Sequence, residues 1–306
     1  MLRSLSTLLI LLSISSCSTI QRWAVRSNSD LFDRAGSEEF KESDWDFFRD
    51  SAPANLKMVE LLALQDPANL LLKKNLIKGY FTLSFSVFET LYLEEKIIGE
   101  TDLYKKRSII HYTRALDYGV DYLSRRNISR EELLLKSEND LRSVLDARIK
   151  SEDYSALLYF AFSWANLIYL QKDDISLNSQ LSRVNAIADW ACDKDPQIET
   201  GLCDLFENRY VKTEKLYLGS LEKFPRNQLL RLELVENIYL PKKEVKKYDE
   251  QVEILKEEFA KWDQSLTGRL NLKNESSYRG AEGLNLFNAV ARKRFEIIQK
   301  YKTKLF

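Results

Sequence analysis

The chain has 306 residues, of which 44% are hydrophobic, and its 46 basic residues are balanced by 46 acidic ones. These values exclude an intrinsically disordered chain, leave room for a substantial core, and argue against a protein that binds nucleic acid through a basic surface. Only nine glycines and five prolines interrupt the sequence, which favours long helices over short strands and tight turns. We therefore expect an all-α protein.

The first 16 residues have the features of a bacterial lipoprotein signal peptide. A basic end with Arg3 is followed by an apolar run over residues 8–12 and by small residues directly before Cys17. The run is shorter than the roughly 20 residues that cross a bilayer. We expect cleavage before Cys17 and acylation of its thiol and amine, so that acyl chains hold the protein on a membrane. A secretory signal without lipid, or a cytosolic apolar tail, is the alternative.

The mature chain divides into a tether and a helical domain. Residues 17–52 contain the polar stretches Ser27-Asn28-Ser29 and Gly36-Ser37-Glu38-Glu39, and we assign them to a lipidated tether and linker. The helical repeat domain then covers residues 53–306. No later stretch of the sequence is long and apolar enough to span a membrane.

Apolar residues at helical spacing predict helices throughout this domain. The expected helices cover residues 55–65, 69–96, 101–125, 129–150, 154–170, 181–195, 199–208, 213–223, 227–239, 242–262 and 284–305. Ser129 and Glu132 have the spacing of a capping box, which predicts a helix start. The pairs Asp66-Pro67 and Asp195-Pro196 end two of the helices, because proline disfavours helical geometry in the residue before it.

Two cysteines besides Cys17 lie on either side of the Asp195-Pro196 turn. Cys192 and Cys203 could form a disulfide that closes a small loop, since the expected compartment can be oxidising. Two buried free thiols are the alternative, because free cysteine is commonly buried.

Three helix ends place apolar or small residues eight and five positions before a proline. These sets are Val59 and Leu62 before Pro67, Ala188 and Ala191 before Pro196, and Tyr217 and Ser220 before Pro225. The pattern resembles the second helix of a tetratricopeptide repeat, although the interval between the last two prolines is shorter than the usual 34 residues. We predict an irregular tetratricopeptide-like solenoid of helical hairpins, with a plain helical bundle as the alternative.

The sequence resembles the T component of tripartite ATP-independent periplasmic (TRAP) transporter systems. The resemblance rests on Cys17, on these hairpins and on the closing pattern Leu286-x-Asn288-x-x-Ala291-x-x-Arg294-Phe295. The resemblance covers residues 55–306. It implies an all-helical lipoprotein that forms a homotrimer, carries pore-like or apolar ligand-facing cavities, and associates with a periplasmic solute-binding protein. It does not identify any single binding residue.

Aromatic residues at helical spacing are the candidates for the wall of such a ligand cavity. They are Tyr80, Phe81, Phe85, Phe88, Tyr92 and Trp164. Ordinary core packing is the default interpretation of these rings, because stacked helices must bury them in any case, and the cavity wall is the functional alternative. The basic run Arg292-Lys293-Arg294 is assigned to a solvated helix face, with contact to anionic headgroups as the alternative.

No catalytic, cofactor or metal site is expected. The single histidine, His111, cannot build a His-based triad or a multi-His metal site, and we expect it to be packed or at the surface. The predicted function is a lipid-anchored accessory component of a TRAP-type transport system, with its body in the periplasm and the outer membrane favoured over the inner one. It would bind a solute-binding protein and an apolar or organic-acid ligand. A tetratricopeptide-like scaffold for envelope assembly is the second hypothesis, and an unrecognised enzyme is the third.

Overall fold

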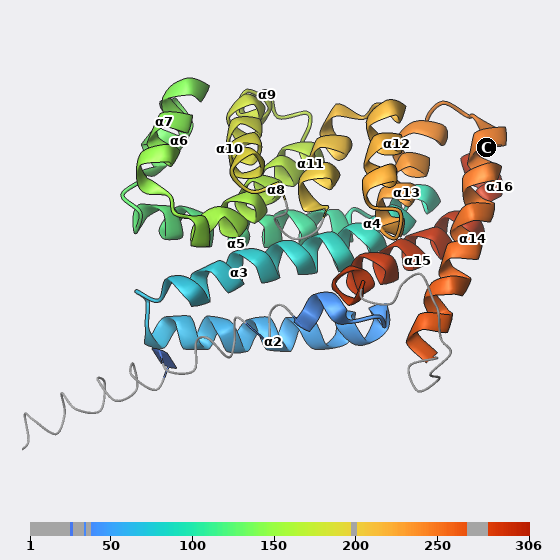
Figure 1. Ribbon diagram of the computed structural model, residues 1–306, viewed down its shortest axis with the longest axis horizontal. Coiled ribbons are helices and arrows are strands. Elements are labelled where there is room, and N and C mark those ends of the chain that lie inside the picture. Colours follow the sequence, from blue (N-terminus) through green and yellow to red (C-terminus); the bar gives the residue numbers. More distant parts are fainter. Residues whose placement is uncertain (1–24, 27–33, 35–37, 197–200, 268–280) are drawn as a thin grey trace, which may run out of the picture.

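The computed structural model describes residues 25–26, 34, 38–196, 201–267 and 281–306 (Figure 1). In these ranges the chain forms helices and no strand, which confirms the predicted all-α class. None of the helices in these ranges has both the length and the apolar character needed to cross a membrane.

The first part of the fold is a set of long helices that lie side by side in Figure 1. A short 3-10 turn, η1 (Glu39–Lys41), precedes α2 (Trp45–Gln65), and α3 (Leu70–Leu83) continues through the π-helical segment η2 (Ser84–Phe88) into α4 (Glu89–Ile98). α5 (Leu103–Ser124) packs against both α3 and α4. α3 lies at the centre of this part, because it contacts α2, α5 and α8 (Tyr154–Leu170).

In the rest of the fold each helix from α10 to α13 packs against the next α-helix along the chain. The remaining elements are α6 (Arg130–Leu135), α7 (Glu138–Arg148), α9 (Ile175–Asn178), α10 (Leu181–Lys194), α11 (Leu202–Val211), α12 (Glu214–Lys223), α13 (Gln228–Leu234), the π-helical η4 (Val235–Tyr239), α14 (Val245–Thr267), α15 (Asn285–Lys300) and α16 (Lys302–Leu305), with 3-10 turns η3 (Ser151–Asp153) and η5 (Glu282–Leu284).

α2 begins ten residues before the expected start at Asn55, so residues 45–52, which we assigned to the linker, belong to this helix. The Asp44 carboxylate caps it by accepting a hydrogen bond of 3.0 Å from the backbone N–H of Phe47. Trp45 and Phe48 are buried against the body. The helix also continues through Pro53, although proline has no backbone N–H to donate to the helical ladder.

The helix expected over residues 129–150 is two helices. The capping box of Ser129 and Glu132 starts α6 as predicted. Ser137 then starts α7, because its hydroxyl accepts a hydrogen bond of 3.2 Å from the backbone N–H of Asp140. A serine that bonds its local backbone competes with continuation of the helix before it, so the chain turns at Lys136.

The last long helix, α15, does not simply extend the row of hairpins. It runs back across the molecule and contacts α13, α4, η2, η1 and α2. Its buried residues include Leu286, Phe287, Val290 and Ala291. The two ends of the described fold are therefore joined through α15, and the tetratricopeptide-like solenoid remains a prediction.

Candidate functional site

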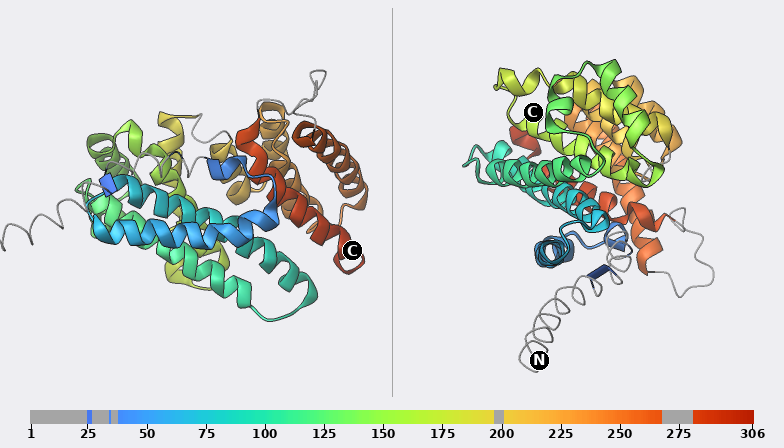
Figure 2. Two further views of the ribbon diagram at one scale, coloured as in Figure 1. Left: turned by 90° about the horizontal axis from the view of Figure 1, so that it is seen from below. Right: turned by 90° about the vertical axis from the view of Figure 1, so that its left-hand side faces the viewer.

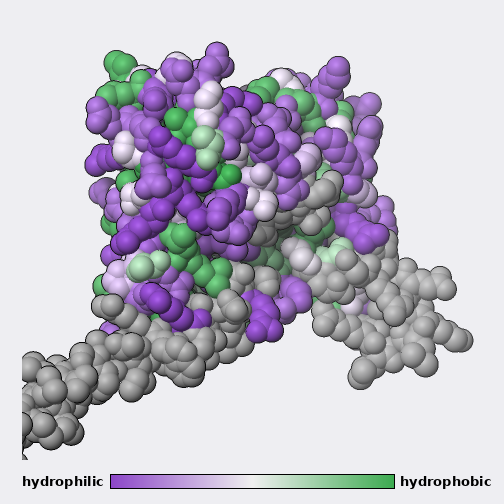
Figure 3. All heavy atoms as spheres, turned by 60° about the vertical axis from the view of Figure 1, so that its left-hand side comes forward, coloured by the Kyte–Doolittle hydropathy of each residue, from purple (hydrophilic) through white to green (hydrophobic). Residues whose placement is uncertain are grey.

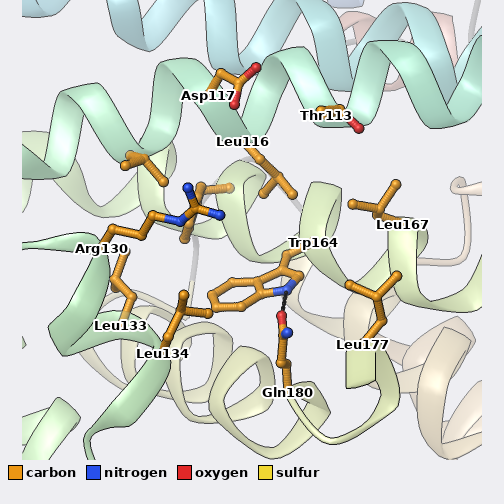
Figure 4. A pocket seen from close by; sticks show the side chains of 12 residues that line it. Thr113, Leu116, Asp117, Arg130, Leu133, Leu134, Trp164, Leu167, Leu177 and Gln180 are labelled. Atoms are coloured by element: carbon orange, nitrogen blue, oxygen red, sulfur yellow. Dashed lines mark hydrogen bonds between the residues drawn. The ribbon is translucent and has the colours of Figure 1, made fainter. Parts of the chain in front are cut away.

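An apolar pocket of about 320 Å³ lies between α5, α6, α8 and α9 (Figure 4). Its wall consists of Thr113, Leu116, Asp117, Val120, Arg130, Leu133, Leu134, Phe160, Trp164, Leu167, Leu177 and Gln180. The volume is at the lower end of the range for small-molecule sites in proteins, and mostly apolar walls with few polar groups are typical of such sites.

Helical periodicity brings these side chains to the pocket. Leu116 and Val120 are four residues apart on α5, and Phe160, Trp164 and Leu167 follow at spacings of four and three on α8, so each set shares one face of its helix. The Phe160 ring fits between the helices because it faces Gly119, where a Cβ atom would collide with the ring.

Few polar groups reach the pocket. The indole Nε1–H of Trp164 donates a hydrogen bond of 3.0 Å to Oε1 of Gln180, which fixes the plane of the ring. The guanidinium of Arg130 points toward the pocket in Figure 4, while Asp117 lies on α5 at its edge. The arrangement suits an apolar molecule with one polar or anionic end, because the walls are apolar and the cation lies at the rim.

The other predicted cavity residues lie in packed surroundings. Phe81 and Phe85 are 1% and 0% exposed, and their rings stack with centroids 5.5 Å apart. Tyr80 bridges helices, since its hydroxyl donates to Glu60 and accepts a hydrogen bond of 3.1 Å from Arg114. These contacts describe a core with polar edges between α2, α3 and α5.

Two more of the predicted cavity residues are on the same helical run. Phe88 packs against His111 with ring centroids 4.6 Å apart, and Tyr92 is half-buried against the hydrophobic core. Burial lowers the pKa of His111, and its Nδ1 lies 2.8 Å from the carbonyl oxygen of Arg107. Trp164 is the one of the six predicted residues that lines the pocket described above.

A cluster of buried charges joins α4, α11, α13, η4 and α15. Arg209 donates to Glu89 and, at 2.7 Å, to Oε1 of Glu233. Arg294 lies within 3.9 Å of Glu89 and Glu236 and 3.8 Å from Glu233. Glu233 is 1% exposed and Arg294 is 3% exposed. We call Arg209, Arg294, Glu89, Glu233 and Glu236 the buried ion cluster.

The electrostatics of the buried ion cluster follow from its burial. Burial opposes the charge on Arg209, but the carboxylates of Glu89 and Glu233 raise its pKa well above the ordinary value. Burial also raises the pKa of the neighbouring Tyr112 hydroxyl, which donates to Glu89. The cluster therefore holds paired ions beside neutral phenols, as low-dielectric surroundings require.

The buried ion cluster lies beside η2. The guanidinium of Arg294 donates a hydrogen bond of 2.8 Å to the carbonyl oxygen of Phe85 and one of 3.0 Å to Oγ1 of Thr90. The indole N–H of Trp45, on α2, donates a hydrogen bond of 2.8 Å to the carbonyl oxygen of Ser86. A π-helical turn rearranges the backbone hydrogen bonds of a helix, and here side chains from two other helices bond its carbonyls.

Assigning the basic run to a solvated face was wrong for Arg294. This residue is four positions after Val290 and four before Ile298, so it lies on the buried stripe of α15. A charged residue inside an apolar stripe was the available signal. Arg292 and Lys293 are half-buried, with Arg292 2.8 Å from Asp263.

Of the two alternatives for Cys192 and Cys203, the structure has the disulfide, with Cα atoms 5.9 Å apart. It links the end of α10 to the start of α11. Cys17 lies outside the described residues. Within the ranges that are described, no group of three or more His, Cys, Asp or Glu side chains is arranged to hold a metal ion.

The sequence matches the family of the TRAP transporter T-component over residues 41–306. The chain belongs to this family. A comparison with curated proteins gives no match. The match confirms the predicted resemblance to this family, and it begins at residue 41, close to the start of α2.

Membership of the TRAP transporter T-component family indicates an accessory role in TRAP transport, association with other TRAP components, and a place in the cell envelope. The family is a transport component and not a family of enzymes.

Proposed function

We propose that this T-component is a lipid-anchored accessory protein of a TRAP-type transport system, with its body in the periplasm. It binds a periplasmic solute-binding protein and takes up an apolar or organic-acid ligand. The family match over residues 41–306 carries the proposal. Cys17 would provide the anchor, since it directly follows an apolar run and small residues.

The pocket beside Trp164 is the proposed ligand site. Its leucines and aromatic rings would hold the apolar body of the ligand, and the Arg130 guanidinium at the rim would pair with a carboxylate. An accessory protein that passes its ligand on needs no catalytic group in this pocket, because holding and releasing the ligand are binding steps.

Partner binding is tested by capture from native envelopes. The full-length chain with a C-terminal tag is crosslinked in cells and purified, and the retained proteins are identified by mass spectrometry. Recovery of a solute-binding protein of the TRAP type supports the proposal. Recovery of outer-membrane assembly factors in its place would favour the envelope scaffold.

Oligomeric state is tested on the same material. The family resemblance implies a homotrimer, so light scattering of the purified protein should give three times the mass of one chain. A monomer at micromolar concentration would remove self-association from the proposal and leave partner binding to be judged by the capture experiment.

Ligand binding is tested by filling the pocket. Leu134→Trp places a larger ring in its wall, while Leu218→Trp makes the same change at an exposed position on α12. The wild type and Leu218→Trp should bind a long-chain carboxylate with similar affinity in isothermal titration calorimetry, and the affinity should fall at least about tenfold in Leu134→Trp. Equal affinities of the two variants would place the ligand elsewhere.

A further inference from the structure

The side of α2 that faces away from the body carries large apolar side chains. They are Phe47, Met58, Leu61 and Leu64, which are 62%, 49%, 63% and 71% exposed. Eleven residues separate Phe47 from Met58, which is close to three helical turns, and the next two residues follow at spacings of three. Met58, Leu61 and Leu64 therefore form a stripe along the last turns of the helix, and Phe47 lies on the same side three turns earlier, beyond Asp50 and Ala54. We call these four apolar side chains the α2 outer face.

No described element covers Phe47, Leu61 or Leu64, while Met58 also borders a hollow between α2 and α3. The opposite side of the helix buries Trp45, Phe48, Ala52 and Leu56, and α2 packs on α3 and on α15. Seen from below in Figure 2, α2 lies in front of the other helices, and in the end-on view it projects from the body. Figure 3 shows separate hydrophobic areas among hydrophilic ones on this face of the molecule.

The chain returns to α2 shortly after the proposed lipid anchor. Nε of Arg26 lies 2.8 Å from Oδ2 of Asp66, the C-cap residue of α2 and only two positions after Leu64. Cys17 and Arg26 are nine positions apart in the sequence, and a chain of that length spans at most roughly 30 Å. Acyl chains on Cys17 would therefore hold the bilayer near the C-terminal end of α2.

The charges around this end are compatible with a lipid surface. Residues 18–26 include Arg22, Trp23 and Arg26 and contain no acidic residue, and arginine and tryptophan are favourable at membrane interfaces. On α2 itself, Lys57 pairs with Glu60 at 2.5 Å. A paired carboxylate on the helix reduces the electrostatic cost of approaching anionic headgroups.

We propose that the α2 outer face lies in the headgroup layer of the membrane to which Cys17 is attached. The proposal rests on the lipid anchor of the proposed function. The short connection keeps the helix close to the lipid, so the modest apolar area of four side chains is sufficient for a second contact. That contact fixes the body in one orientation, with α2 toward the bilayer and the row α7, α10 and α12 away from it (Figure 1).

The test measures whether a probe on α2 reaches lipid. Leu61→Cys and Leu64→Cys introduce one thiol each into the full lipidated chain, where Cys17 is acylated and Cys192 is bonded to Cys203. Ile175→Cys, at an 84% exposed apolar position on α9, is the matched control. Each variant carries an environment-sensitive fluorophore and is reconstituted into phosphatidylethanolamine and phosphatidylglycerol vesicles with or without phospholipids bearing a nitroxide near the headgroup.

Nitroxide lipid should quench the probes at positions 61 and 64 several-fold more strongly than the probe at 175, with a blue-shifted emission. Equal quenching at the three positions, with the protein recovered in the vesicle fraction, would overturn the proposal while leaving the lipid anchor intact. Efficient crosslinking between Leu61→Cys copies without lipid quenching would assign the face to a second copy of the chain and also overturn it. Failure of the wild type to float with vesicles would refute the anchor and this proposal together.

Discussion

Arg294 is the residue of the buried ion cluster that lies near three carboxylates at once, within 3.9 Å of Glu89 on α4, Glu233 on α13 and Glu236 on η4. Replacing it with alanine would leave a surplus of buried negative charge and would remove the hydrogen bond to the Phe85 carbonyl. We expect Arg294→Ala to lower the free energy of unfolding by about 3 to 5 kcal/mol. Urea unfolding followed by circular dichroism measures this change.

Glu296→Ala is the control for that variant, because it removes a charge from an exposed position on the same helix. Its effect should stay within about 0.5 kcal/mol. Similar losses in the two variants would show that α15 tolerates no change in charge, and the specific role of Arg294 would be withdrawn.

Glu236 should make the stability depend on pH. Burial raises its pKa from the ordinary 4.5 to about 7, so the folded state binds a proton more tightly than the unfolded state does. Protonation of Glu236 therefore contributes to the free energy of unfolding in full below about pH 4.5, and this contribution is lost as the pH rises toward 7. Relative to Glu236→Gln, the wild type should therefore lose about 1 to 3 kcal/mol of unfolding free energy across this range. A constant difference between the two proteins would contradict the prediction.

The sequence allowed some of these residues to be predicted and not others. The sequence left Trp164, Phe81 and Phe85 alike as candidates for a cavity wall or for the core, and the structure places Trp164 beside the pocket and packs Phe81 and Phe85 in the core. An aromatic stripe identifies the buried face of one helix. The distance between that face and the opposing helix, however, depends on small residues in the opposing helix. Gly119 on α5 is such a residue, and its contact with Phe160 cannot be read from either helix separately.

At the scale of elements, the contact between α5 and α8 is set by Gly119. Gly119→Ala places a Cβ atom against the Phe160 ring and should lower the free energy of unfolding by about 1 to 3 kcal/mol. Gly219→Ala is the matched control, since nothing lies within 4 Å of a Cβ there and the position is inside α12. It should stabilise the protein by about 0.5 to 1 kcal/mol, because alanine is the better helix former. Thermal unfolding of both variants tests the pair, and destabilisation by both would refute the packing argument.

Helix existence was easier to predict than helix continuity. Apolar periodicity indicated the helix pair over residues 154–195, and the proline signals ended it correctly, with α10 finishing at Lys194. No local sequence pattern predicts the π-helical segment η2. The Phe85 carbonyl in this segment accepts a hydrogen bond from Arg294, which is more than two hundred residues away in the sequence. The break at Lys136 was not predicted, because the residues on both sides of it favour a helix. The Ser137 side chain caps the start of α7 and so ends the helix before it.

At the scale of the whole molecule, α15 determines whether the protein behaves as an open row of hairpins. In a simple repeat array each unit contacts only its neighbours, so loss of the last unit leaves the first ones folded. Here the last long helix reaches both ends of the described fold. Asn288 accepts a hydrogen bond of 3.0 Å from the backbone N–H of Gln228 on α13, and Asn285 donates one of 3.0 Å to the carbonyl oxygen of Lys41 near α2.

Removal of residues 285–306 should therefore affect the first helices as well as the last ones. We expect hydrogen exchange to show lost protection in α3 and η2, because the Phe85 carbonyl loses its bond to Arg294 and the buried face around Leu286 loses its partner. Removal of residues 302–306 is the control. It deletes the contact between the rings of Phe306 and Tyr248, 4.9 Å apart, and should cost only about 1 kcal/mol with α3 unchanged. Protection of α3 that survives the longer deletion would show that the hairpins fold independently, and it would favour the open solenoid.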